Sequence, residues 1–305
     1  MEEFISDAEK SYIKHLASFG YREDGRAPNT IRPISLNIGC IPQANGSCAI
    51  TIDKLSLTVG IKLEVVTIDE DDVFDDRIGF SVEYVGFKSS LQQSSHKSKP
   101  DKLLFPKYER ELKRSFTPSD LAILESKEHA WKVDIDVVVH EKVDDNLILF
   151  ISLGVKAALL SCRIPTLKIN PNGTLSPAFP RSAPYHSRFH SFSNSWNCPI
   201  VGVVCDINDH IFVDPSSTEI EAAHCICNVI GTFERKSKDL PIPIISSVEL
   251  SSKNGIFTGS KEKELIEICA IAGKLALSTI EEFLVSFIQS LDTVSVQDAQ
   301  QKLEK

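Results

Sequence analysis

The segment AWKVDIDVVVHEKVDDNLILFISLGVKAALLSCRIP, residues 130–165, contains the two clearest secondary-structure patterns of the chain. Apolar side chains alternate with other residues from Trp131 to Val137, which is typical of a strand with one buried face. Residues 146–162 then carry apolar side chains at helical spacing, and small residues such as Gly154 would let a helix lie close to a sheet. The segment therefore predicts a strand followed by a helix that packs on it.

The same order of strands and then helices occurs on both sides of this segment. Before it we predict a helix that starts after Ser6 with Glu9 as a capping box, strands at 34–38, 49–52, 55–65 and 80–84, a turn at Asn45-Gly46, and a helix in the second part of 97–114. After it we predict strands at 200–205, 211–213, 222–230 and 244–248, and a long helix over 261–288. This order indicates an α+β fold built from two similar halves.

Composition shifts along the chain suggest its organisation. We divide it into an N-terminal helix with an Asp-Gly-Arg element (1–30), a first half (31–169), a long loop (170–196), a second half with a closing helix (197–290) and a polar tail (291–305). The loop is rich in Pro, Ser and Asn, and its aromatic residues lie beside basic ones. These aromatics either stack on single-stranded nucleic acid or anchor the loop to the body of the protein, and we favour the second interpretation.

The charge balance limits how the chain could bind a nucleic acid. Its 305 residues include 33 Lys and Arg against 42 Asp and Glu, a formal net charge of -9, so no general basic surface attracts phosphates. The best basic segment is 97–114, where Arg110, Lys113 and Arg114 are candidate contacts for a nucleic acid. A solvated helix face, or ion pairs with neighbouring subunits, is the alternative interpretation of these three residues. The acidic N-terminus and the lack of a long apolar run predict an intracellular protein.

Common signatures of cofactor and metal sites are missing from the sequence. No phosphate-loop, dinucleotide, serine-hydrolase or zincin motif occurs, which weakens most enzyme hypotheses. The eight cysteines lack CxxC spacing and are expected to be small core residues. We expect no metal at His224, Cys225 and Cys227, because a strand points His224 away from the two thiols. The acidic run 69–76 is expected to be a solvated connection, and we expect no cofactor.

Four segments carry a family resemblance. Residues 6–39, SDAEKSYIKHLASFGYREDGRAPNTIRPISLNIG, resemble the N-terminal helix, Asp-Gly-Arg element and first strand of the ribonuclease PH-like subunits of the RNA exosome. Residues 130–165 are similar to the centre of that domain, residues 198–233 to its second half, and 261–288 to its closing helix. Among ring subunits, AEKSYI and KAALLSCRIP are most similar to the ribosomal RNA-processing protein 42 type.

The resemblance implies a degenerate active site. Active members use inorganic phosphate to cleave the 3'-terminal phosphodiester, which requires cations for phosphate and carboxylates at the reacting end. Asp214 matches the first of two aspartates, but Ile220 stands at the second position. An Arg-Arg pair appears as Glu109-Arg110. We therefore expect no catalytic residues. The alternatives are a phosphorolytic 3'-to-5' exoribonuclease whose site a partner completes, and a free-standing RNA-binding module.

The resemblance also implies partners. These are other ribonuclease PH-like ring subunits, S1-domain cap subunits, a separate catalytic nuclease, and single-stranded RNA that passes through a central channel. The expected role is structural, in 3'-to-5' RNA processing and degradation that includes ribosomal RNA maturation. The expected locations are the nucleus, the nucleolus and the cytoplasm.

Overall fold

The computed structural model describes most of the chain between residues 5 and 271. The described residues are 5–53, 55–68, 73–85, 99–123, 126, 128–140, 146–180, 188–192, 197–233, 243–252, 262–269 and 271. Residues 69–72 of the acidic run, most of the helix expected over 261–288 and the tail at 291–305 lie outside them.

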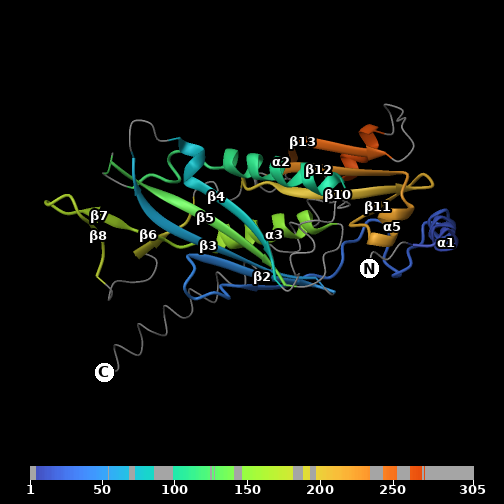
Figure 1. Ribbon diagram of the computed structural model, residues 1–305, viewed down its shortest axis with the longest axis horizontal. Coiled ribbons are helices and arrows are strands. Elements are labelled where there is room, and N and C mark those ends of the chain that lie inside the picture. The colour runs from blue at the N-terminus through green and yellow to red at the C-terminus, as the bar shows by residue number, and fades with distance from the viewer. Residues whose placement is uncertain are drawn as a thin grey trace, which may run out of the picture.

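The first half forms a five-stranded sheet in the order β1-β2-β3-β5-β4 (Figure 1). The strands are β1 (Ser35–Ile38), β2 (Gly46–Ile52), β3 (Leu55–Thr67), β4 (Ile78–Tyr84) and β5 (His129–Val139), and a 3-10 turn, η1 (Phe74–Arg77), precedes β4. All neighbours are antiparallel except β4 and β5, which are parallel. The period-2 patterns of the sequence correctly predict β3 and β5, since their alternate residues are buried.

The turn expected at Asn45-Gly46 does not include Gly46. Gly46 is the first residue of β2 and not part of the turn between β1 and β2. A Cβ atom at residue 46 would lie 2.4 Å from the carbonyl oxygen of Ala158. The glycine therefore serves a close approach between β2 and the helix that contains Ala158, and the Asn-Gly pair is not a two-residue hairpin turn here.

Two helices lie against the first sheet. They are α2 (Lys99–Ser115) and α3 (Leu147–Ser161). The bounds of α3 were predicted within a residue, whereas α2 begins at Lys99 and so covers the first part of 97–114 as well as the second. Nearly every residue of α3 is buried, because β2 and β3 cover one side of this helix and β10 of the second sheet contacts another. A Cβ atom at Gly154 would lie 2.9 Å from Val59 Cγ2, so the expected close packing of α3 on the sheet is confirmed.

The second half forms a four-stranded antiparallel sheet in the order β11-β10-β12-β13. Its strands are β10 (Ile200–Ile207), β11 (His210–Val213), β12 (Cys225–Phe233) and β13 (Pro243–Ser252), and residues 262–269 are helical. The expectation of a strand from residue 222 is wrong, because Ala222 ends a short helix, α5 (Ser217–Ala222). Ser216 and Glu219 form the capping box that starts this helix.

The segment 170–196 is not a single long loop. It contains β8 (Leu175–Pro177), which pairs with β7 (Leu167–Ile169), and β9 (Phe189–His190), which pairs with β6 (Ile164–Pro165). Strands of two or three residues are too short to show a period in the sequence. Phe192 is 4% exposed and its ring contacts Phe116 edge-on at 5.5 Å, which confirms for this residue the anchoring interpretation. Residues 181–187 and 193–196 lie outside the described part.

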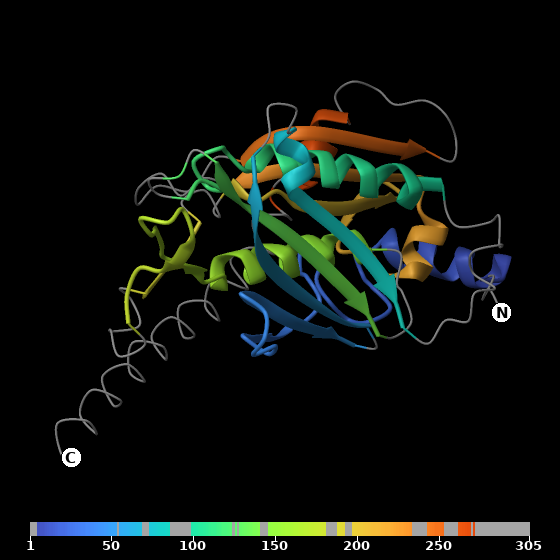
Figure 2. The ribbon, with the colours of Figure 1, turned by 60° about the vertical axis from the view of Figure 1, so that its left-hand side comes forward.

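The two halves share a core. One cluster of buried apolar residues includes side chains of β2, β3, β5 and α3 together with Ile200, Val201 and Ile230 of the second sheet. The N-terminal helix α1 (Asp7–Ala17) packs on the second half, where Ile13 and Ala17 meet Phe212. Figure 2 shows α3 behind the first sheet and α1 beside α5. Among the described residues, no helix has both the length and the apolar character needed to cross a membrane.

The cysteines provide the first testable prediction. Seven of the eight are buried, Cys40 being the half-buried exception, and none is in a disulfide. Burial raises the pKa of Cys162 to about 12 and that of Cys198 to about 11, and only the thiolate reacts readily with alkylating agents. We expect iodoacetamide to modify only Cys40 in the folded protein and all eight thiols in denaturant, as measured by intact-protein mass spectrometry. A second adduct on the folded protein would contradict this burial pattern.

Candidate functional site

Asp214, the position that the resemblance matched to a catalytic aspartate, lies just after β11 and is fully buried. Its backbone is in the left-handed region with φ 47°, which aspartate tolerates better than most residues. Arg32 donates to the carboxylate from its backbone N at 2.9 Å, from Nε at 3.0 Å and from Nη2 at 2.8 Å. Arg26 Nη1 and Asn146 Nδ2 donate at 3.2 Å each. The two oxygens therefore accept from these groups rather than from solvent.

A second buried ion pair lies beside the first. Arg22 Nε and Nη2 donate to the two carboxylate oxygens of Glu219 at 2.8 and 2.6 Å, and neither side chain is more than 5% exposed. Arg22 also donates to the backbone oxygens of Val213 and Asp214 at 2.8 and 3.0 Å. Such bidentate geometry favours arginine over lysine. The capping box orients Glu219, since its Oε2 accepts from the backbone N of Ser216 at 2.9 Å.

The Asp-Gly-Arg element places Arg26 at the edge of this cluster. Gly25 has φ 76°, a left-handed conformation that suits glycine. Partial burial raises the pKa of Asp24, but the backbone and side-chain hydrogen bonds from Arg26, together with its charge, outweigh this and lower the pKa. Arg26 donates to Asp24 Oδ2 at 2.6 Å and reaches Asp214 with its other nitrogens.

We call Arg22, Arg26, Arg32, Asp214 and Glu219 the arginine junction. It joins the segment after α1 to the end of β11, to α5 and, through Asn146 and Phe150, to α3. The guanidinium of Arg32 lies 5.1 Å from the centre of the Phe150 ring, which is fully buried. The three arginines of the junction face three carboxylates, those of Asp214, Glu219 and the neighbouring Asp24, so the positive and negative charges are equal in number.

Asn146, just before α3, completes the contact with the junction. Its Nδ2 donates to Asp214 and to the backbone oxygen of Pro215. Its buried Oδ1 has no hydrogen-bond partner among the described residues and does not cap α3. The first turn of α3 thus lies beside a carboxylate of the protein itself, which is the charge that a helix N-terminus favours.

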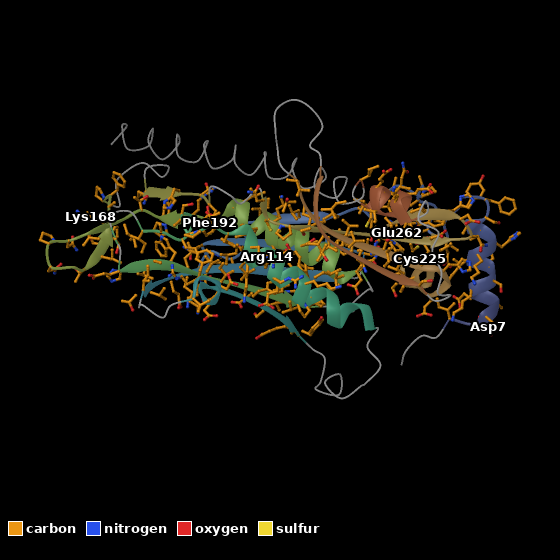
Figure 3. The ribbon with its side chains drawn as sticks, turned by 90° about the horizontal axis from the view of Figure 1, so that it is seen from above. Asp7, Arg114, Lys168, Phe192, Cys225 and Glu262 are labelled. Atoms are coloured by element: carbon orange, nitrogen blue, oxygen red, sulfur yellow. The ribbon has the colours of Figure 1, made fainter. Side chains whose placement is uncertain are left out.

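The other sequence-derived site positions lie on two helices. Ile220 is a half-buried residue of α5, next to Glu219. Glu109, Arg110, Lys113 and Arg114 lie on α2, whose Tyr108 and Leu112 are buried. Figure 3 shows Arg114 in the middle of the molecule, well away from α1 and from the β7–β8 hairpin.

The cations of α2 have nearby carboxylates. Lys113 pairs with Glu109 at 3.0 Å, and both Arg110 and Arg114 approach Glu111, at 3.6 and 3.0 Å. Lys107 reaches Glu249 of β13 at 3.2 Å. Arg110 and Arg114 nevertheless remain 57% and 65% exposed, so their charges face solvent. Ion pairs at such exposure are weak and exchange readily for phosphate.

The described residues contain no group of three or more His, Cys, Asp and Glu side chains that could hold a metal ion. In particular, the ring of His224 hydrogen-bonds to Asn208 at 3.2 Å.

Sequence reasoning noted the Asp-Gly-Arg element and Asp214 but missed Arg22, Arg32 and Glu219. The signal for Glu219 is the Ser216-Ser-Thr-Glu219 capping box, which predicts a helix start. No local signal exists for Arg22, because its partner Glu219 lies 197 residues away in the sequence.

Comparisons with known proteins agree with this architecture. Residues 30–165 match the model of the 3' exoribonuclease family, domain 1 (RNase PH). The chain is 28% identical over 264 residues to the exosome complex component Rrp42 of Methanocella arvoryzae, covering 86% of this chain and 95% of that protein. It is 27% identical over 228 residues to the exosome complex component RRP42 of Saccharomyces cerevisiae, covering 72% of this chain and 78% of that protein.

A solved structure shows the same fold. A chain of the Archaeoglobus fulgidus exosome with RNA bound to the active site superposes with a TM-score of 0.62 at 18% identity, covering 91% of this chain and 98% of that one. Together with the match of residues 30–165 to the 3' exoribonuclease family, domain 1, this likeness shows that the chain has an RNase PH-like fold.

Proposed function

We propose that this chain is a ring subunit of an RNA exosome and that its role there is structural rather than catalytic. The likeness to the archaeal and yeast Rrp42 components supports membership of the ring. In this role the chain supports 3'-to-5' RNA processing and degradation, including ribosomal RNA maturation.

The observation that carries the non-catalytic role is the state of Asp214. A carboxylate that organises a phosphorolytic site must reach a cation, the substrate or a proton. That of Asp214 is fully buried and accepts from Arg32, Arg26 and Asn146. At the positions that the resemblance matches to the active site, Ile220 has an apolar side chain and Glu109 has a carboxylate in place of a cation. All three residues thus favour a chain that leaves chemistry to other subunits.

The proposal can be tested by reconstitution. We expect the purified chain to release no nucleoside diphosphate from a 3'-terminal RNA in phosphate buffer, and to co-purify with other RNase PH-like subunits when these are expressed together. Thin-layer chromatography of the products and native mass spectrometry of the complex provide the two measurements. Diphosphate release that requires a partner, and that Asp214→Asn abolishes in a complex that native mass spectrometry shows to be intact, would instead establish a site completed by that partner. A monomer that binds RNA tightly without partners would establish a free-standing RNA-binding module.

The RNA contact in this proposal is the basic face of α2, on which Arg110 and Arg114 are exposed and Lys113 is half-buried. We expect Arg110→Gln, Lys113→Gln and Arg114→Gln together to weaken RNA binding by the assembled ring. If all three residues contact phosphates of single-stranded RNA, the slope of log K against log salt should fall by about 2. Fluorescence anisotropy at several salt concentrations measures this slope. An unchanged slope would favour the solvated-face interpretation of these residues. Lys62→Gln, on an exposed part of β3, is the matched control.

The proposed partners follow from the ring. They are other RNase PH-like subunits, S1-domain caps, a separate catalytic nuclease and single-stranded RNA in the channel, and the proposed locations are the nucleus, the nucleolus and the cytoplasm. Fluorescence microscopy of the tagged chain together with a tagged cap subunit tests the locations, and co-purification from each fraction tests the partners.

A further inference from the structure

The chain contains three Asn-Gly pairs, at residues 45–46, 172–173 and 254–255, of which the structure describes the first two. The backbone nitrogen that follows an asparagine can attack the side-chain Cγ of that asparagine and close a five-membered imide ring. A glycine in the second position hinders this attack least, because it has no Cβ atom. The fold places the two described pairs in opposite environments.

Asn45 is held by its side chain and by its neighbour. Its Oδ1 accepts from the backbone N of Leu63 at 3.0 Å, and its Nδ2 donates to the backbone oxygen of Arg163 at 3.2 Å. Gly46 is buried at the start of β2, so close to Ala158 that a Cβ atom would not fit. Ring closure requires rotation of both the side chain and the next peptide group. The end of β2 must therefore open before Asn45 can react.

Asn172 lies in the exposed turn that joins β7 to β8. Residues 171–174 are all exposed, and a Cβ atom at Gly173 would meet no atom within 4 Å beyond the adjacent residues. Gly173 has φ 80°, and its N–H donates to the backbone oxygen of Asn170 at 2.9 Å. This hydrogen bond must break to free the nitrogen, and an exposed bond in a turn opens far more readily than a buried sheet does.

Thr174 prepares the side chain of Asn172 for the reaction. Oδ1 of Asn172 accepts from the backbone N of Thr174 at 3.2 Å and from its Oγ1 at 2.7 Å. Asn170 Nδ2 donates to the same Oγ1 at 3.1 Å, which directs the hydroxyl proton toward Asn172. When a nitrogen attacks Cγ, negative charge develops on Oδ1, and donors already aimed at this oxygen stabilise that charge. The bond to the backbone N of Thr174 also folds the side chain back over the peptide group that attacks it.

We propose that the β7–β8 turn promotes the deamidation of Asn172, which makes this residue a site of spontaneous modification. Hydroxide takes the N–H proton of Gly173, and the nitrogen forms a bond to Cγ of Asn172. The bond between Cγ and Nδ2 then breaks, and Nδ2 takes up a proton from water and leaves as ammonia. Water opens the imide at Cγ to give aspartate, or at the backbone carbonyl carbon to give isoaspartate.

The modification changes both charge and backbone at one end of the molecule, where Figure 3 marks Lys168 of β7. Each product replaces a neutral amide by a carboxylate, so the net charge becomes more negative by one. Isoaspartate also adds a carbon atom to the main chain, inside the loop that Asn170 N and Thr174 O close at 2.9 Å. The inference uses no residue of the arginine junction or of α2, so it stands apart from the proposed ring function.

The experiment compares the Asn-Gly pairs within one chain. The full protein is incubated in mildly alkaline buffer, with and without guanidinium chloride, and peptide mapping by mass spectrometry follows each asparagine over time. We expect Asn172 to react at least about tenfold faster than Asn45 in the folded protein, because Asn45 must wait for local opening. In denaturant we expect nearly equal rates, with Asn172 no faster than it is in the folded chain.

Three variants test the part that the turn plays. Thr174→Val removes the hydroxyl at nearly equal size and should slow the reaction of Asn172 about threefold, as expected for the loss of one exposed hydrogen bond. Thr174→Ser keeps the hydroxyl and should react like the unchanged protein, and Asn172→Gln should abolish modification at this residue. Thermal unfolding of each variant checks that the fold is kept. Equal rates at Asn172 and Asn45 in the folded protein, a rate at Asn172 that rises in denaturant, or an unchanged rate in Thr174→Val would each overturn the proposal.

Discussion

Asp214→Asn is expected to lower the free energy of unfolding by about 3–5 kcal/mol, because removing one partner of a buried ion pair leaves the other charge uncompensated. Asparagine keeps the size of the side chain and tolerates the left-handed backbone of this residue, so the change removes the charge without a cavity or new backbone strain. Arg32 and Arg26 would then face an amide that offers one acceptor oxygen in place of two. Urea unfolding followed by circular dichroism measures the change.

A double-mutant cycle separates the ion pair from general damage. The variant Asp214→Asn/Arg32→Met removes both charges, and we expect it to be more stable than the sum of the two single changes predicts. Glu83→Ala, an exposed carboxylate on β4, is the matched control and should change stability by less than about 0.5 kcal/mol. A loss below about 1 kcal/mol for Asp214→Asn would mean that solvent reaches this carboxylate.

Phe150→Ala is expected to cost about 3–5 kcal/mol, since a fully buried phenyl ring leaves a cavity that the packed α3 cannot close. The same substitution removes the ring under the guanidinium of Arg32. Phe150→Leu fills most of the cavity but also lacks the ring. The difference in stability between the two variants therefore measures packing, and the loss that remains in Phe150→Leu includes the cation–π contact.

Chemical denaturation of both Phe150 variants provides the measurement. Phe19→Ala, at a phenylalanine that is 64% exposed, controls for the loss of an aromatic residue without a cavity and should be nearly neutral. If Phe150→Ala cost no more than Phe19→Ala, the close packing of α3 between the two sheets would be refuted.

The elements that the sequence predicts well are those with long periods. β3 and β5 alternate over many residues, and α3 is long and apolar, so local pattern and burial agree. Helix α5 was not predicted, because six residues are too few to show a helical period next to a strand-like sequence. The start of β2 was not predicted, because the contact that requires Gly46 is made with Ala158, which is distant in the sequence.

In the candidate site, too, local features could be predicted from the sequence and long-range contacts could not. Asp214 was found through the family resemblance, because it matches the first of the two aspartates that active members carry. Its surroundings could not be found from the sequence, because Arg32 is 182 residues away and no spacing rule connects two such positions. The basic character of α2 was predicted, but the approach of Arg110 and Arg114 to a single carboxylate, Glu111, depends on side-chain directions that the sequence does not specify.

The 197-residue separation between Arg22 and Glu219 has a consequence during synthesis. At about 5–20 residues per second, the ribosome needs roughly 10–40 s to make the chain between these two residues. Throughout this interval α1 and Arg22 have been made while their partners have not. The aromatic side chains of α1 and an uncompensated arginine are then open to chaperones. Helix α1 and Arg22 are therefore among the last parts of this domain to reach their native positions, although they are made long before Glu219.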